Sequence, residues 1–158
     1  IGNTLRDIDS SRTSSGTFLS SDIHYLIQKI DNIVYNYLKI PIENYEHLQV
    51  VNYKPSQKYN AHYDACDINE NSCKEDIKKG GLRYATFIIY LNDNFTGGET
   101  HFPKKNIKTT PKRGKGILFF NLNDNNTMRR DNSLHAGLPP ISGEKWMCNK
   151  WIRLNKYK

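Results

Sequence analysis

The most informative stretch of this 158-residue sequence is Tyr59-Asn60-Ala61-His62-Tyr63-Asp64. It lies in a run, residues 58–64, whose boundaries and composition predict a β-strand. Successive side chains of a strand point to opposite faces of its sheet, so His62 and Asp64 are predicted to share one face. An imidazole and a carboxylate placed in this way can bind a metal ion, but such pairs also arise by chance and need a third ligand.

The third candidate ligand is His135, which lies on another short predicted strand, residues 133–137. Two histidines and one carboxylate occupy one face of an octahedron and leave three positions open, an arrangement typical of non-haem Fe(II) oxygenases. A tetrahedral zinc with the same ligands and a water is the alternative, and it would be hydrolytic. Lys145 favours the oxygenase, because its ammonium can pair with the distal carboxylate of a small dicarboxylate that chelates the metal.

Periodicity predicts one helix and many strands. The helix has apolar residues at three- and four-residue spacing, begins behind candidate N-caps at residues 20–22, and ends before Pro41. Gly97-Gly98 is predicted to be a hairpin turn with positive φ. Strands are predicted at residues 47–54, 58–64, 83–92, 99–102, 116–121, 133–137 and 145–154. A helix packed on an antiparallel double sheet accounts for this pattern.

Two polar segments, residues 65–82 and 122–132, are predicted to be long loops and candidate lids. Cys66 and Cys73 lie in the first segment and would bridge in an oxidising compartment, although the odd total of 3 cysteines favours reduced thiols. Cys148 lies among apolar neighbours and is predicted to be a buried thiol. The cysteines therefore leave the cellular compartment open.

Length and composition set the remaining bounds. A chain of 158 residues predicts one domain over residues 1–158, and its start at Ile1 leads us to expect a truncated N-terminus. The 37% hydrophobic and 11% aromatic content excludes a disordered chain. No apolar run approaches the ~20 residues of a membrane span. The net charge of +7 indicates a solvated basic surface, because residues 104–115 lack the interleaved aromatic residues of a nucleic-acid groove.

Further motifs keep their order along most of the chain: Arg12-Thr13-Ser14-Ser15-Gly16, Leu48-Gln49-Val50-Val51-Asn52-Tyr53, Arg83-Tyr84-Ala85-Thr86-Phe87-Ile88-Ile89-Tyr90-Leu91, Gly97-Gly98-Glu99-Thr100-His101-Phe102-Pro103, Leu134-His135-Ala136-Gly137, Gly143-Glu144-Lys145-Trp146 and Asn149-Lys150-Trp151-Ile152-Arg153. Together with the stretch around His62, these motifs resemble the prolyl 4-hydroxylase branch of the 2-oxoglutarate- and Fe(II)-dependent dioxygenases. The resemblance implies a mainly β fold with one N-terminal helix, the double-stranded β-helix of jelly-roll or cupin-like proteins.

The resemblance also implies roles for individual residues. His62, Asp64 and His135 would hold Fe(II). Lys145 would complete the catalytic set by binding the C5 carboxylate of 2-oxoglutarate. The residues implied to bind this cosubstrate are Lys145, Tyr90, Tyr53, Thr86, Thr100 and Trp151. Arg153 departs from the pattern of some animal collagen-type members, which carry a histidine there.

The implied reaction is 4-hydroxylation of peptidyl proline, coupled to oxidative decarboxylation of 2-oxoglutarate to succinate and CO2, with O2 as the oxidant and ascorbate as the reductant. The implied partner is a proline-containing peptide or protein. Two alternatives stay open. One is hydroxylation of a lysyl side chain, a free amino acid or a nucleobase on the same iron site, and the other is a catalytically silent module that binds proline-rich partners. The sequence identifies neither the particular peptide nor the oligomeric state.

Overall fold

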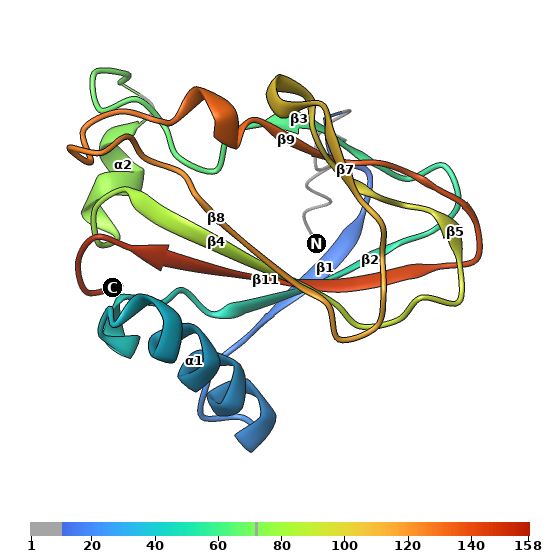
Figure 1. Ribbon diagram of the computed structural model, residues 1–158. Helices are drawn as coiled ribbons and strands as arrows, with labels where there is room; N and C mark the ends of the chain where they lie inside the picture. Colours follow the sequence, from blue (N-terminus) through green and yellow to red (C-terminus); the bar gives the residue numbers. More distant parts are fainter. Residues whose placement is uncertain (1–10, 72) are drawn as a thin grey trace, which may run out of the picture.

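The computed structural model describes residues 11–71 and 73–158, and two facing β-sheets form its centre (Figure 1). The larger sheet contains, in spatial order, β1 (Ser15–Leu19), β2 (Leu48–Tyr53), β11 (Lys145–Arg153), β4 (Arg83–Tyr90) and β8 (Gly116–Phe120). The smaller sheet contains β3 (Tyr59–His62), β9 (His135–Gly137), β6 (Thr100–Phe102) and β7 (Ile107–Thr109). A separate ladder pairs β10 (Pro140–Ser142) with β5 (Thr96–Gly97). The fold is mainly β, as the sequence pattern predicts.

Every strand predicted from the sequence is present, as β2, β3, β4, β6, β8, β9 and β11. The strands β1, β5, β7 and β10 were not predicted. The last three contain only two or three residues each, too few to show an alternating pattern. In β1 most side chains are exposed, so it lacks the apolar face that marks a strand in a sequence.

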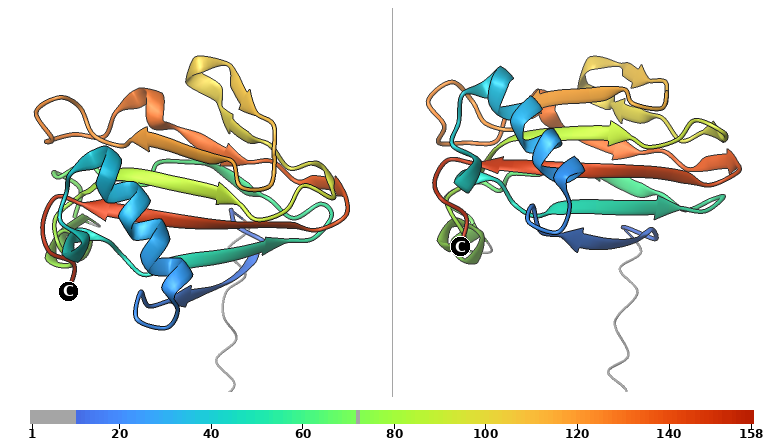
Figure 2. Two further views of the ribbon diagram at one scale, coloured as in Figure 1. Left: turned by 60° about the horizontal axis from the view of Figure 1, so that its bottom comes forward. Right: turned by 90° about the horizontal axis from the view of Figure 1, so that it is seen from below.

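Helix α1 (Tyr25–Leu38) lies across the outer face of the larger sheet (Figure 2). It begins later than predicted, because the His24 side chain caps it by accepting a hydrogen bond from a backbone N–H of the first turn at 3.2 Å. Lys39 ends the helix in the left-handed conformation. A buried ion pair between Asp31 Oδ1 and Lys150 Nζ, 2.7 Å apart, fastens α1 to β11.

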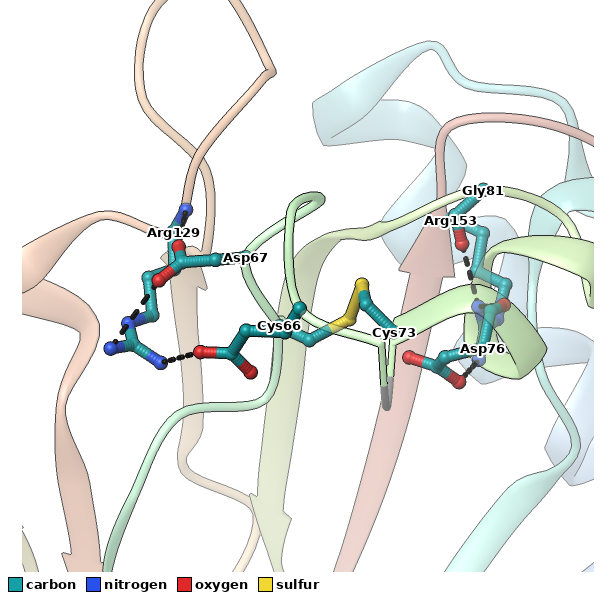
Figure 3. The surroundings of a disulfide bond; sticks show 8 residues. Cys66, Asp67, Cys73, Asp76, Gly81, Arg129 and Arg153 are labelled. Atoms are coloured by element: carbon teal, nitrogen blue, oxygen red, sulfur yellow. Dashed lines mark hydrogen bonds and ion pairs between the residues drawn. A yellow bond between two sulfur atoms is a disulfide. The ribbon is translucent and has the colours of Figure 1, made fainter.

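A second helix, α2 (Cys73–Lys78), lies in the segment that was predicted to be a loop, so the expectation of a single helix is wrong. Cys73 forms a disulfide with Cys66 (Figure 3) and packs in a buried apolar cluster. Six residues are too few to show a helical period, and it is this packing that holds them. Cys148 is free and buried, as predicted. Short 3-10 turns are η1 (Ile42–Asn44), η2 (Pro103–Lys105) and η3 (Asp131–Ser133).

Gly97 and Gly98 both have the predicted positive φ, at 72° and 71°, but they do not form a hairpin. β5 pairs with β10, whereas β6 pairs with β7 and β9, so the glycines carry the chain from one ladder to the smaller sheet. A Cβ on Gly98 would lie only 3.1 Å from Cδ of Lys145. Glycine at this position therefore leaves room for the Lys145 side chain.

The described helices are α1, α2 and the three 3-10 turns. None of them has the length and apolar character needed to cross a lipid bilayer.

Candidate active site

The register between β3 and β9 brings two histidines together. His62 on β3 lies opposite His135 on β9, and their ring centroids are 4.3 Å apart. Asp64 lies just beyond the end of β3, with Oδ1 3.6 Å from His62 Nε2 and Oδ2 3.6 Å from His135 Nε2. The possible ligand atoms of the three side chains all lie within 4.8 Å of one another. The structure thus gathers the three predicted ligands into a group that can hold a metal ion.

Backbone carbonyls orient both imidazoles. His62 Nδ1 lies 2.7 Å from the carbonyl oxygen of Asn60, and His135 Nδ1 lies 2.9 Å from that of Ser133. Each Nδ1–H donates to its carbonyl, so Nε2 is the ring nitrogen available to a metal ion. Burial lowers the pKa of His135, and this favours the neutral ring that a metal ion needs.

Asp64 is buried and held by a hydrogen-bond chain from the larger sheet. The hydroxyl of Thr86 donates to Asp64 Oδ2 at 2.6 Å, and Asn121 Nδ2 donates to the Thr86 hydroxyl at 2.8 Å. Burial alone would raise the pKa of Asp64, but His135 and His62 outweigh it and hold that pKa well below its usual range. The carboxylate is therefore ionised and ready to bind a cation.

A pocket adjoins this group. Of the predicted cosubstrate residues, Tyr53, Thr100 and Trp151 line the pocket together with the two histidines and Asp64. Thr86 was also predicted to line it, but its hydroxyl is engaged by Asp64 instead. Strand parity predicts the face of the strand on which Thr86 lies, but it does not predict that Asp64 is the hydrogen-bond partner of Thr86.

Lys145 is buried deep beside this pocket. Its side chain is completely shielded from solvent, and its Nζ lies 4.5 Å from the centre of the Tyr53 ring. Within the described residues, Nζ has no hydrogen-bond partner. Burial lowers the pKa of Lys145 to about 8. A buried ammonium that lacks a partner is unfavourable, so the site is suited to a ligand that carries a carboxylate.

Residues 48–153 match the sequence model of the 2OG-Fe(II) oxygenase superfamily. The chain belongs to this superfamily. The putative prolyl 4-hydroxylase of Acanthamoeba polyphaga mimivirus is 42% identical over 153 residues, which cover 97% of this chain and 63% of the relative. Prolyl 4-hydroxylase 2 of Arabidopsis thaliana is 36% identical, and the match covers 95% of this chain and 55% of the relative. The chain thus spans less than two thirds of the length of these relatives.

Solved structures show the same relationship. The 2OG complex of the viral collagen prolyl hydroxylase vCPH from Paramecium Bursaria Chlorella virus-1 has a TM-score of 0.79 and 36% identity, and the match covers 92% of this chain and 81% of that one. A prolyl hydroxylase from Trichoplax adhaerens, solved with a hypoxia inducible factor peptide, has a TM-score of 0.65 at 18% identity and is similar in fold. The two facing sheets of this 2OG-Fe(II) oxygenase are therefore the expected double-stranded β-helix.

In this oxygenase the hydroxyl of Tyr90 is occupied by protein groups. It lies 2.7 Å from Thr100 Oγ1, accepts from the Thr100 backbone N–H at 3.1 Å, and donates to the Thr109 carbonyl at 3.2 Å. Burial raises the pKa of Tyr90, so the hydroxyl stays protonated. Tyr90 thus fixes Thr100, which lines the pocket, rather than lining the pocket itself.

Five residues that line the pocket were not predicted as site residues: Tyr59, Ile88, Gly137, Met147 and Asn149. Tyr59 stacks on His62 with ring centroids 3.6 Å apart, and Met147 and Asn149 line the pocket between Lys145 and Trp151. Alternate residues of β11 share one face, so strand parity counted from Lys145 would have identified the last two.

The remaining candidates lie outside the pocket. Trp146 is exposed to solvent, on the strand face opposite Trp151. Arg153 forms ion pairs with Glu46 and Asp76. Among the described residues, the metal-binding group does not include His24, His47 or His101.

Proposed function

We propose that this chain hydroxylates peptidyl proline at C4 and couples that reaction to oxidative decarboxylation of 2-oxoglutarate. The observation that carries the proposal is the buried ammonium of Lys145, which has no hydrogen-bond partner among residues 11–71 and 73–158 and lies beside a pocket that also contains a His-Asp-His group. The named relatives support the choice of proline, because they are prolyl hydroxylases.

The donor set fits Fe(II). His62 Nε2, His135 Nε2 and a carboxylate oxygen of Asp64 would be the protein ligands, and Asp64 would neutralise part of the metal charge. Two imidazoles and one carboxylate suit this ion and leave positions free for other ligands. The carbonyls behind both Nδ1 atoms and the hydroxyl of Thr86 would keep the ligands in place.

The cosubstrate fits the other end of the site. Lys145 Nζ would donate to the distal carboxylate of 2-oxoglutarate, a partner that the described part of the chain does not supply. Tyr53 and Thr100 would line the same end, and Tyr90 would hold Thr100. When bound, Fe(II) with 2-oxoglutarate and O2 supplies the C–H hydroxylation, yielding hydroxyproline, succinate and CO2. Buried apolar side chains around the pocket would keep water from the reacting atoms.

The pocket lining suits a proline ring. Tyr59 and Trp151 present aromatic rings to the pocket, and proline-rich segments dock on surfaces lined by aromatic side chains. A lysyl side chain would find no acidic partner in this lining besides Asp64, which the metal would occupy. We further propose ascorbate as the reductant that keeps the iron reduced, and one catalytic domain over residues 1–158.

Mass spectrometry tests the proposal. The protein, supplied with Fe(II), 2-oxoglutarate, O2 and ascorbate, is incubated with a panel of proline-containing and lysine-containing peptides. We expect addition of one oxygen atom to proline, lost when either Fe(II) or 2-oxoglutarate is omitted. Oxygen on lysine would support the alternative substrate class. Absence of any 2-oxoglutarate turnover would support the catalytically silent module.

A further inference from the structure

Four charged side chains form a continuous chain of ion pairs behind the pocket. Arg83 Nε and Nη2 donate to Glu46 Oε1 and Oε2 at 2.6 and 2.9 Å. Arg153 Nε donates to the same Oε1 at 2.8 Å, and Arg153 Nη2 donates to Asp76 Oδ1 at 2.7 Å. Glu46 and Arg153 are almost completely buried, at 4% and 1% exposure. The chain alternates in sign, so its charges balance only while all four members are present.

Arg153 links the two carboxylates of this chain. Besides its two ion pairs, its Nη1 donates to the backbone carbonyls of Asp76 and Gly81 at 2.7 and 2.6 Å (Figure 3). The three guanidinium nitrogens therefore serve partners on three sides at once. A lysine carries its charge on one nitrogen and cannot reproduce this forked set of contacts.

One end of the chain reaches the wall of the pocket. The guanidinium carbon of Arg83 lies 3.9 Å from the centre of the Trp151 ring, and Trp151 lines the pocket. The backbone N–H of Glu46 also donates to the carbonyl of Trp151 at 2.9 Å. Arg83 and Arg153 share Oε1 of Glu46, so the position of the Glu46 carboxylate, and of the Arg83 guanidinium that it holds against the indole, depends on Arg153.

The other end of the chain reaches α2. Asp76 lies on α2, whose first residue, Cys73, forms the disulfide with Cys66. Figure 3 shows Arg153 reaching the helix on the side away from Arg129, which pairs with Asp67 of the same segment. The disulfide-linked segment is thus joined to the body of the protein at two separate places.

We propose that Arg153 is a positioning residue that fixes the Arg83–Trp151 wall of the pocket through Glu46 and couples that wall to α2 through Asp76. Arg153 does not line the pocket, so it acts on a bound substrate only through Arg83 and Trp151. The part of this inference that concerns substrate rests on the proposed function, whereas the coupling of Trp151 to α2 does not.

Trp151 fluorescence tests the coupling without any activity. The chain has 2 tryptophans, so Trp146→Phe, at an exposed position, leaves Trp151 as the reporter. Arg153→Lys and Asp76→Asn are made in this background, and Arg129→Gln is the control, since it removes the ion pairs to Asp67 and Glu70 of the same segment. We expect the first two variants to shift Trp151 emission and its quenching by acrylamide, and the control to leave both unchanged.

Asp76→Asn keeps the test decisive if Arg153→Lys fails to fold, because Asp76 is partly exposed and asparagine has its shape. Unchanged Trp151 emission in folded Asp76→Asn would overturn the coupling, and so would an equal shift in Arg129→Gln.

Kinetics test the consequence for substrate. We expect Asp76→Asn and Arg153→Lys to raise the KM for a peptide substrate by about fivefold or more, a usual size for coupling between two sites. A shifted emission with an unchanged peptide KM would overturn the positioning role. If no peptide is hydroxylated, the proposed function fails while the fluorescence result still decides the coupling.

Discussion

The hydroxyl of Thr86 donates a 2.6 Å hydrogen bond to Asp64 Oδ2, the carboxylate oxygen that faces His135. The hydroxyl in turn accepts from Asn121 Nδ2, so Thr86 has no freedom to rotate away. Partners of this kind hold a metal-binding carboxylate in one orientation before the metal arrives. Thr86 therefore orients one of the three side chains that could hold a metal ion.

Thr86→Val should weaken metal binding by about 10- to 100-fold, the usual effect of removing a group that orients a ligand. The change keeps the shape of the side chain and removes only the hydroxyl. Isothermal titration with Mn²⁺ measures the affinity. Thr17→Val, at an exposed position of β1, is the control, and equal affinity in both variants would contradict the role of Thr86.

Asp64→Ala should abolish turnover and most metal binding. The two imidazoles that remain are neutral and leave the charge of a dication uncompensated. Metal content after dialysis, together with 2-oxoglutarate consumption, checks this expectation. Asp67→Asn removes a carboxylate that pairs with Arg129 outside the metal group, and it should retain both properties. An Asp64→Ala protein that keeps its metal would refute the ligand assignment.

Lys145→Ala should raise the requirement for 2-oxoglutarate by roughly 30- to several-thousand-fold, because truncating one partner of a buried charge pair costs about 2–5 kcal/mol. Metal binding should stay nearly intact, since Lys145 lies outside the metal group. The measurement is the dependence of turnover on 2-oxoglutarate concentration at saturating Fe(II). Lys115→Ala, on an exposed lysine, provides the comparison, and similar curves for both variants would remove the cosubstrate assignment.

Binding of 2-oxoglutarate should weaken as the pH rises above 8. Burial lowers the pKa of Lys145 to about 8 from an ordinary 10.5 in the ligand-free protein, and only the protonated form attracts a carboxylate. Each pH unit above this value should weaken the apparent affinity by about tenfold. Calorimetric titration with Mn²⁺ in place of iron, between pH 7 and 9, follows the effect.

The same pKa shift predicts how folding stability depends on pH. Between pH 8 and 10.5 the folded protein binds fewer protons than the unfolded chain at Lys145, so this residue makes the free energy of unfolding rise with pH in that window. Lys145→Arg keeps its charge at every accessible pH. In Lys145→Arg, the pH dependence of 2-oxoglutarate affinity and that of the free energy of unfolding should therefore both disappear. If either one persists, another titratable group causes it.

Reduction of the Cys66–Cys73 disulfide should lower the free energy of unfolding by about 2 kcal/mol, because the cross-link closes a short loop in the unfolded chain. Urea denaturation with and without a phosphine reductant measures the difference. Reduction should also increase cleavage by protease within residues 66–78. A Cys66→Ser/Cys73→Ser variant should show no response to the reductant, and equal stability of the oxidised and reduced wild type would contradict the expectation.

The amino-acid sequence by itself predicted the strands that carry the site and the three residues that the structure gathers into a group able to hold a metal ion. The strands β2, β4 and β11 are long enough to show period-two patterns, and His62, Asp64 and His135 are residue types with specific metal chemistry. Lys145 could be added because an ammonium on a neighbouring strand has a chemical partner in a dicarboxylate. These are properties of single residues or of local spacing, and they can be read along the chain.

The tertiary structure alone decided the partners of the polar side chains. Strand parity places Thr86 and Tyr90 on one face of β4, but only the register of neighbouring strands shows that Thr86 meets Asp64 and Tyr90 meets Thr100. Likewise, Glu46, Arg83, Arg153 and Asp76 come from four separate elements or loops, and α2 has no period of its own. Hydrogen bonds and ion pairs act over a few ångströms, so their partners are set by how distant segments pack and not by the order of residues along the chain.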